Sequence, residues 1–123
     1  NKVRLPYNSN SISQIAATEL INNFHTVQKQ IDSIKEERMR LIGELAKINP
    51  ITVFPSDANF ILFQASQNGE SIFRNLMKNG VLVRNLGAHF RLKNCMRVTI
   101  GTKAENDQFL DQLTKAIQHL ETD

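Results

Sequence analysis

The hydrophobic spacing of the chain changes at Asn49-Pro50, and this change limits the folds that the sequence can form. Over 12–48, apolar residues recur every three or four positions, which is typical of amphipathic helices. Beyond that point, short apolar runs predict strands, and helical spacing returns twice, in a segment ending at Gly80 and in one beginning at Thr102. The resulting order of elements predicts an α+β fold, in which a small, mostly antiparallel sheet of about four strands carries helices packed on one face.

The chain of 123 residues has the length of one globular domain. We expect an extended linker from a missing upstream domain over 1–10, because Asn1 is not an initiator Met and Pro6 favours extended backbone. A helical region should follow over 11–48, broken near Asn22-Asn23, and an α/β sandwich over 51–123. The helical region is too long for so small a domain to cover, so part of it should lie against another body.

Four strands are predicted after the helical region. The run 59–63 is almost continuously apolar, which is typical of a central strand covered on both faces. The other predicted strands are 51–54, 96–100 and 81–83, the last of which should be internal and leads into Arg84.

The last of these strands places an arginine away from the core. Its apolar residues, Met96, Val98 and Ile100, must face the helices, so the intervening Arg97 points to the opposite side of the sheet. A partly buried guanidinium requires an anion or several carbonyl groups. Arg97 could therefore pair with an internal group such as Asp57, or it could join Arg84 in binding a carboxylate or phosphate ligand.

Other kinds of site are not indicated. The three histidines are far apart and Cys95 has no thiol partner, so no metal site is predicted. No nucleophile motif is present, and the loop cations Arg91 and Lys93 are typical of solubilising side chains. The single cysteine favours a reducing, cytoplasmic compartment, the net charge of +3 is too small to indicate nucleic acid, and no apolar run is long enough for a membrane.

Several motifs together resemble the C-terminal part of the histidinol-phosphate aminotransferase family, a branch of the fold-type I aminotransferases. They follow one another in the family's order over nearly the whole chain. The matching segments are Pro6-Tyr7-Asn8, Ser11-x-x-Gln14-x-Ala16-Ala17, Ser56-Asp57-Ala58-Asn59-Phe60, Gly80-Val81-Leu82-Val83-Arg84, Cys95-Met96-Arg97-Val98-Thr99-Ile100-Gly101-Thr102 and Glu105-Asn106.

This resemblance implies the small domain of an enzyme dependent on pyridoxal 5'-phosphate, which moves an amino group between glutamate and imidazole-acetol phosphate in histidine biosynthesis. It implies that the cofactor and its lysine belong to the missing large domain, so the fragment itself holds no catalytic and no cofactor-binding residue and is inactive. Arg97 matches the family residue for the carboxylate of glutamate, and Arg84 the one near the substrate phosphate. The implied partners are the chain's own N-terminal large domain, small-molecule substrates and, in the intact enzyme, a second subunit of a homodimer.

Two alternatives remain open. The chain could be the small domain of another aminotransferase of this fold, acting on aromatic amino acids or resembling threonine-phosphate decarboxylase. It could also be a stand-alone module that binds anions or RNA through Arg84, Arg91, Lys93 and Arg97. Its phenylalanines are scattered rather than interleaved with these cations, which disfavours base stacking and hence nucleic acid.

Overall fold

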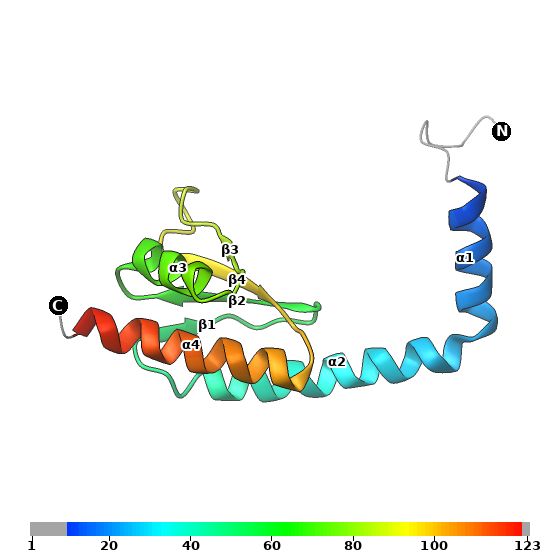
Figure 1. Ribbon diagram of the computed structural model, residues 1–123, viewed down its shortest axis with the longest axis horizontal. Coiled ribbons are helices and arrows are strands. Elements are labelled where there is room, and N and C mark those ends of the chain that lie inside the picture. The colour runs from blue at the N-terminus through cyan, green and yellow to red at the C-terminus, as the bar shows by residue number, and fades with distance from the viewer. Residues whose placement is uncertain (1–9, 122–123) are drawn as a thin grey trace. The chain divides into compact units, whose positions relative to one another are not determined.

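The computed structural model describes residues 10–121 (Figure 1). The linker expected over 1–10 therefore lies outside the described residues, except for Asn10. Contacts along the chain divide it into two compact units, 1–32 and 33–123.

The first unit contains the helix α1 (Ser11–Asn22) and the beginning of the helix α2 (Phe24–Leu45). Asn10 caps α1, because its side-chain oxygen accepts a hydrogen bond from the Ser13 amide at 2.8 Å. The predicted start of this helix and the break at Asn23 are confirmed. No residue of α1 is buried within the described structure.

The second unit contains a four-stranded antiparallel sheet with the order β1-β2-β4-β3. The strands are β1 (Ile51–Val53), β2 (Phe60–Ala65), β3 (Arg84–Asn85) and β4 (Cys95–Thr99). The predicted run 59–63 corresponds to β2, which is one of the two interior strands. The predicted α+β architecture is confirmed.

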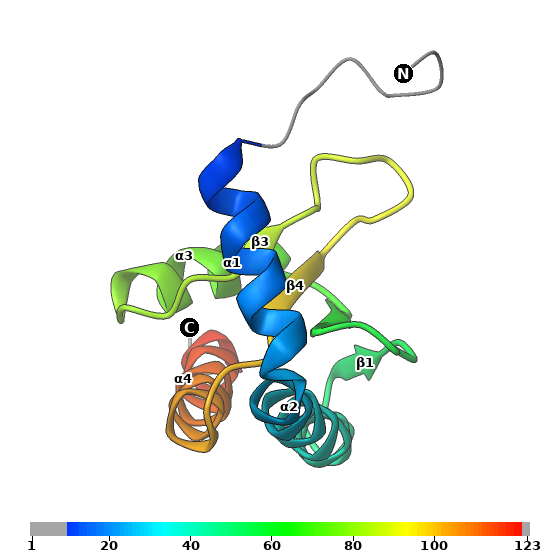
Figure 2. The same ribbon diagram turned by 90° about the vertical axis from the view of Figure 1, so that its right-hand side faces the viewer.

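Helices cover one face of this sheet. The C-terminal part of α2, α3 (Gly69–Lys78) and α4 (Lys103–Glu121) share one hydrophobic core with it, and Figure 2 shows α2 and α4 nearly end-on beneath the strands. Alternate strand residues enter this core because successive side chains of a strand point to opposite faces. The core residues of β2 and β4 are Ile61, Phe63, Ala65, Met96 and Val98.

The other side of the sheet is called the arginine face below. It consists of the strand residues that alternate with the core residues, and apart from Cys95 they are exposed or half-buried. The members of this face are Thr52, Phe60, Leu62, Gln64, Arg84, Cys95, Arg97 and Thr99.

Three local predictions are wrong. The segment 81–83 forms no strand, because the Val81 amide bonds to the Leu76 carbonyl as the end of α3 is capped, and pairing begins only at Arg84. That strand, β3, lies at the edge of the sheet rather than inside it. The strand β2 is fully buried on only one face, with Phe60 and Leu62 half-buried on the other.

Candidate functional site

Arg84 and Arg97 lie directly opposite each other on adjacent strands. They form a register pair of the β3–β4 ladder, so their side chains leave the sheet on the same side with Cβ atoms about 4.5–5.5 Å apart. Because Met96 and Val98 enter the core on either side of Arg97, both guanidinium groups belong to the arginine face. Like charges in this position repel each other, so an anion bound by both guanidinium groups would stabilise the pair. The sequence predicted this shared face.

Arg97 is held on one side by an aromatic ring. Its guanidinium carbon lies over the Phe60 ring, 4.7 Å from the ring centroid, and the residue is half-buried. Arg84 is exposed. The side chain of Arg84 is therefore less restricted than that of Arg97, although the two residues lie opposite each other in the ladder.

No acidic side chain of residues 10–121 forms an ion pair with either arginine. Asp57, the internal partner considered for Arg97, lies instead 3.8 Å from the Arg38 guanidinium and is fully exposed. Arg38 also donates a hydrogen bond to the Ala58 carbonyl at 3.1 Å. Asp57 and Arg97 therefore form no ion pair in the structure.

A buried polar network lies at the end of β4, just beyond Arg97. Asn106 is 2% exposed, accepts a hydrogen bond from the Gly101 amide at 3.0 Å and donates to the Gly101 carbonyl at 3.1 Å. It also donates to the Glu37 carboxylate at 2.8 Å, and Glu37 is paired with Arg40 at 2.7 Å. Hydrogen bonds from Arg40 and then Asn106 lower the pKa of Glu37 below its usual 4.5. The network fixes the chain where the arginine-bearing strand enters α4.

Sequence reasoning missed this network. The only signal is an asparagine in the first turn of a helix, since such a residue often bonds to nearby backbone. Its partner Glu37 is 69 positions away, so its burial depends on how α2 packs against α4.

The loop 86–94 joins the two arginine strands. His89 stacks on Phe90 with ring centroids 5.1 Å apart, and the Arg91 guanidinium lies 5.2 Å from the centroid of the same ring. All three residues are exposed, and Lys93 is exposed as well. The structure therefore places Arg91 in a separate exposed cluster, and neither Arg91 nor Lys93 lies in the ladder with Arg84 and Arg97.

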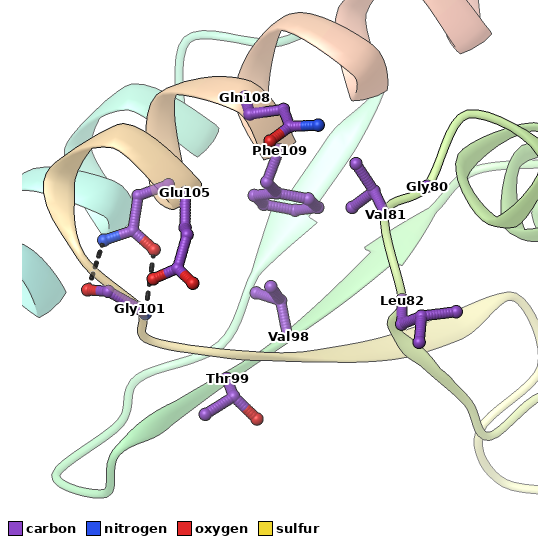
Figure 3. A pocket seen from close by; sticks show the side chains of 10 residues that line it. Gly80, Val81, Leu82, Val98, Thr99, Gly101, Glu105, Gln108 and Phe109 are labelled. Atoms are coloured by element: carbon purple, nitrogen blue, oxygen red, sulfur yellow. Dashed lines mark hydrogen bonds between the residues drawn. The ribbon is translucent and has the colours of Figure 1, made fainter.

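A groove of about 380 Å³ lies at the C-terminal end of β4, where 81–83 separates from the sheet (Figure 3). In Figure 3, Phe109 projects from α4 toward Val98 of β4, and Glu105 lies near Gly101. It is lined by Gly80, Val81, Leu82, Val98, Thr99, Gly101, Glu105, Asn106, Gln108 and Phe109. Neither Arg84 nor Arg97 lines this groove, so the anion-binding candidate is the arginine face.

Residues 10–121 contain no cluster of three or more His, Cys, Asp or Glu side chains that could hold a metal ion. Within the same range, no helix has the length and apolar character needed to cross a membrane.

The comparisons with known proteins agree with the resemblance. The family model for class I and II aminotransferases matches residues 1–113. Histidinol-phosphate aminotransferase of Vesicomyosocius okutanii subsp. Calyptogena okutanii is 44% identical over 115 residues, which are 94% of this chain and 32% of that protein. The chain therefore spans about a third of the length of the curated relatives it matches.

Two solved structures have the same fold. Histidinol-phosphate aminotransferase from Clostridium acetobutylicum has a TM-score of 0.83 at 28% identity, covering 96% of this chain and 36% of that one. The enzyme from Sinorhizobium meliloti, solved in complex with pyridoxal-5'-phosphate, has a TM-score of 0.81 at 23% identity, covering 97% of this chain and 33% of that one. The family model covers most of this chain, and the chain therefore belongs to the class I and II aminotransferases.

Proposed function

We propose that this chain is the C-terminal small domain of a histidinol-phosphate aminotransferase, which interconverts L-histidinol phosphate and 2-oxoglutarate with imidazole-acetol phosphate and L-glutamate. The observation that carries the proposal is the pair Arg84 and Arg97, two cations opposite each other in the sheet without an acidic partner in the described chain. The substrates of this reaction carry carboxylate and phosphate groups, the anions that guanidinium groups bind best.

The two arginines have separate roles in this proposal. Arg97, half-buried and stacked, binds the carboxylate of glutamate through two parallel hydrogen bonds. Arg84, exposed on the edge strand, contacts the phosphate of the other substrate. Both residues orient the substrate and transfer no proton, because a guanidinium stays protonated at all working pH values.

Pyridoxal 5'-phosphate supplies the chemistry of amino-group transfer in such an enzyme by stabilising negative charge at the substrate carbon. In the family that the chain resembles, the residues that hold this cofactor belong to the large domain, and none of those segments has a counterpart here. We infer that the remaining two thirds of the enzyme hold the cofactor and that the isolated chain is inactive. We also infer a cytoplasmic, homodimeric enzyme.

The exposed apolar residues of α1 support a large-domain partner. Ile12 is 79% exposed and Ile15 65% exposed, and a short helix that buries no side chain is only marginally stable alone. We propose that the large domain of the same polypeptide covers these side chains in the intact enzyme.

Replacement of Arg97 tests the proposal in the full-length enzyme. Arg97→Ala should raise the KM for glutamate and lower kcat/KM. The loss of transition-state stabilisation calculated from kcat/KM should be up to about 3 kcal/mol, since a charge-assisted hydrogen-bonded pair is lost. Arg91→Ala, which removes an exposed loop cation, is the matched control and should leave these constants unchanged. Unchanged glutamate kinetics in Arg97→Ala would refute the assignment.

A second measurement tests the branch of the family. Arg84→Ala should weaken the reaction with histidinol phosphate more than it raises the KM for glutamate, because the phosphate loses its cation. If the parent enzyme used phenylalanine and ignored histidinol phosphate, the chain would instead belong to an aminotransferase for aromatic amino acids.

A further inference from the structure

The ring of Phe60 is the one aromatic contact of the arginine pair in the described structure. We propose that Phe60 is a positioning residue, which fixes the direction of the Arg97 guanidinium toward the substrate anion. This inference rests on the proposed function, because it requires Arg97 to bind that anion.

The register of the sheet brings the two residues together. Phe60 is paired with Thr99, whereas Arg97 is paired with Leu62, so Phe60 and Arg97 are diagonal neighbours on the arginine face. The distance of 4.7 Å from the guanidinium carbon to the ring centroid lies within the range of a cation–π contact. A phenyl ring accepts no conventional hydrogen bond, so this contact leaves the N–H donors of Arg97 available for an anion.

The backbone that carries the ring is held in place by hydrogen bonds. Ser56 donates a hydrogen bond to the Phe60 carbonyl, and the Asn59 carbonyl accepts one from the Ile100 amide at 2.9 Å. Phe60 is also half-buried. A half-buried ring on this backbone restricts the rotamers of the long Arg97 side chain before the substrate arrives, which reduces the entropy lost on binding.

Arg84 lacks this support. It is exposed, and no ring of residues 10–121 lies over its guanidinium. The two arginines therefore differ in a way that suits their proposed ligands: Arg97 is oriented in advance for a flat carboxylate, and Arg84 can adjust to a phosphate.

The test measures steady-state kinetics of the full-length enzyme with Phe60 replaced. Phe60→Leu and Phe60→Met remove the ring and keep apolar bulk, and each should raise the KM for glutamate about three- to tenfold with little change in kcat. Phe60→Tyr keeps the ring and should restore a KM close to that of the parent enzyme. Phe73→Leu, which alters a half-buried phenylalanine of α3 packed on the core, is the control and should lower the Tm without raising the KM.

A double variant separates a direct effect on Arg97 from a general structural one. In the Arg97→Ala background, Phe60→Leu should raise the KM no further, because the group that the ring positions is already gone. If Arg97→Ala raises the KM while the non-aromatic variants leave it unchanged, the role of Phe60 is overturned and the role of Arg97 stands. If Arg97→Ala itself leaves the KM unchanged, the proposed function fails, and the positioning role fails with it.

Discussion

Two pairs of polar residues differ in where their partners come from. Asn106 and Glu37 are satisfied entirely by partners within the chain, as buried polar groups normally are. Arg84 and Arg97 lie opposite each other without an acidic partner in residues 10–121. The first arrangement stabilises the fold, and the second supports our proposal that the two arginines bind an anionic ligand.

Asn106→Ala should lower the free energy of unfolding of the chain by about 2–3 kcal/mol. The substitution leaves the amide and the carbonyl of the half-buried Gly101 without their partner. It also removes one hydrogen bond to Glu37, whose carboxylate keeps those from Arg40. Urea unfolding followed by circular dichroism measures the loss. Gln108→Ala, at an exposed position of the same helix, should change stability by less than about 0.5 kcal/mol. Equal effects of the two substitutions would contradict the importance of the network.

The contribution of Glu37 should depend on pH. Its pKa is lower in the folded chain than the usual 4.5, so the stabilisation is present above about pH 4.5 and is lost as the pH falls through the folded value. Glu37→Gln should therefore be less stable than the parent by about 1 kcal/mol at pH 7, and the difference should shrink in acid. Urea midpoints measured from pH 7 to pH 3 test this. Exposed Glu36→Gln is the control, and a pH-independent gap for Glu37→Gln would contradict the prediction.

The face of Arg97 could be predicted because it follows from a local pattern, the period of two in 96–100. The ring over Arg97 could not be predicted, since Phe60 reaches it through the register of β2 against β4. Register depends on pairing between segments distant in sequence. The sequence therefore predicted the cations of the candidate site, but it could not predict the ring of Phe60 that lies over one of them.

At the scale of elements, local signals predicted the helices better than the strands. The helix predicted near Thr102 begins with a capping box of Thr102 and Glu105, in which the Thr102 amide donates to the Glu105 carboxylate at 2.7 Å. The apolar run 81–83 predicted a strand, yet its first amide, that of Val81, donates a hydrogen bond to the Leu76 carbonyl at the end of α3. Competition between a helix cap and a sheet edge is decided by tertiary structure, so the apolar pattern alone could not resolve it.

Two glycines should respond in opposite ways to alanine. Gly43 lies inside α2 and Gly80 follows α3 with φ +79°, and an added Cβ would meet no atom within 4 Å at either position. Gly43→Ala should raise the free energy of unfolding by up to about 1 kcal/mol, because alanine favours helix. Gly80→Ala should lower it by about 1–2 kcal/mol, because its left-handed backbone disfavours a side chain. Chemical unfolding of both variants is the measurement, and a shift in the same direction would contradict this account.

At the scale of the whole molecule, the stability of the chain resides in the unit 33–123. Every residue of the hydrophobic core belongs to that unit, from Leu41 to Ile117. The unit 1–32 buries no side chain of α1. The chain also spans about a third of its curated relatives, which agrees with a domain that works as part of a longer protein.

Breaking α1 should therefore leave the melting of the sheet unit almost unchanged. Ile15→Pro disrupts α1 at a position 65% exposed and should shift the Tm of the chain by less than about 2 °C. Leu113→Ala creates a cavity at a fully buried position and should cost about 2–5 kcal/mol, lowering the Tm by roughly 8 °C or more. Differential scanning calorimetry compares the two. A large loss in Ile15→Pro would show that α1 is part of the cooperative core.

The alternation of faces in β4 also determines where the gene can gain or lose a codon. One extra residue inside Cys95–Thr99 would reverse the direction of every side chain beyond it, exchanging a guanidinium for a valine against the helical layer. One extra residue within 87–93, at the exposed end of the hairpin, would lengthen a surface turn and leave both cations facing the same way. Length variation among descendants of this gene should therefore collect in the turn and be absent from the strand.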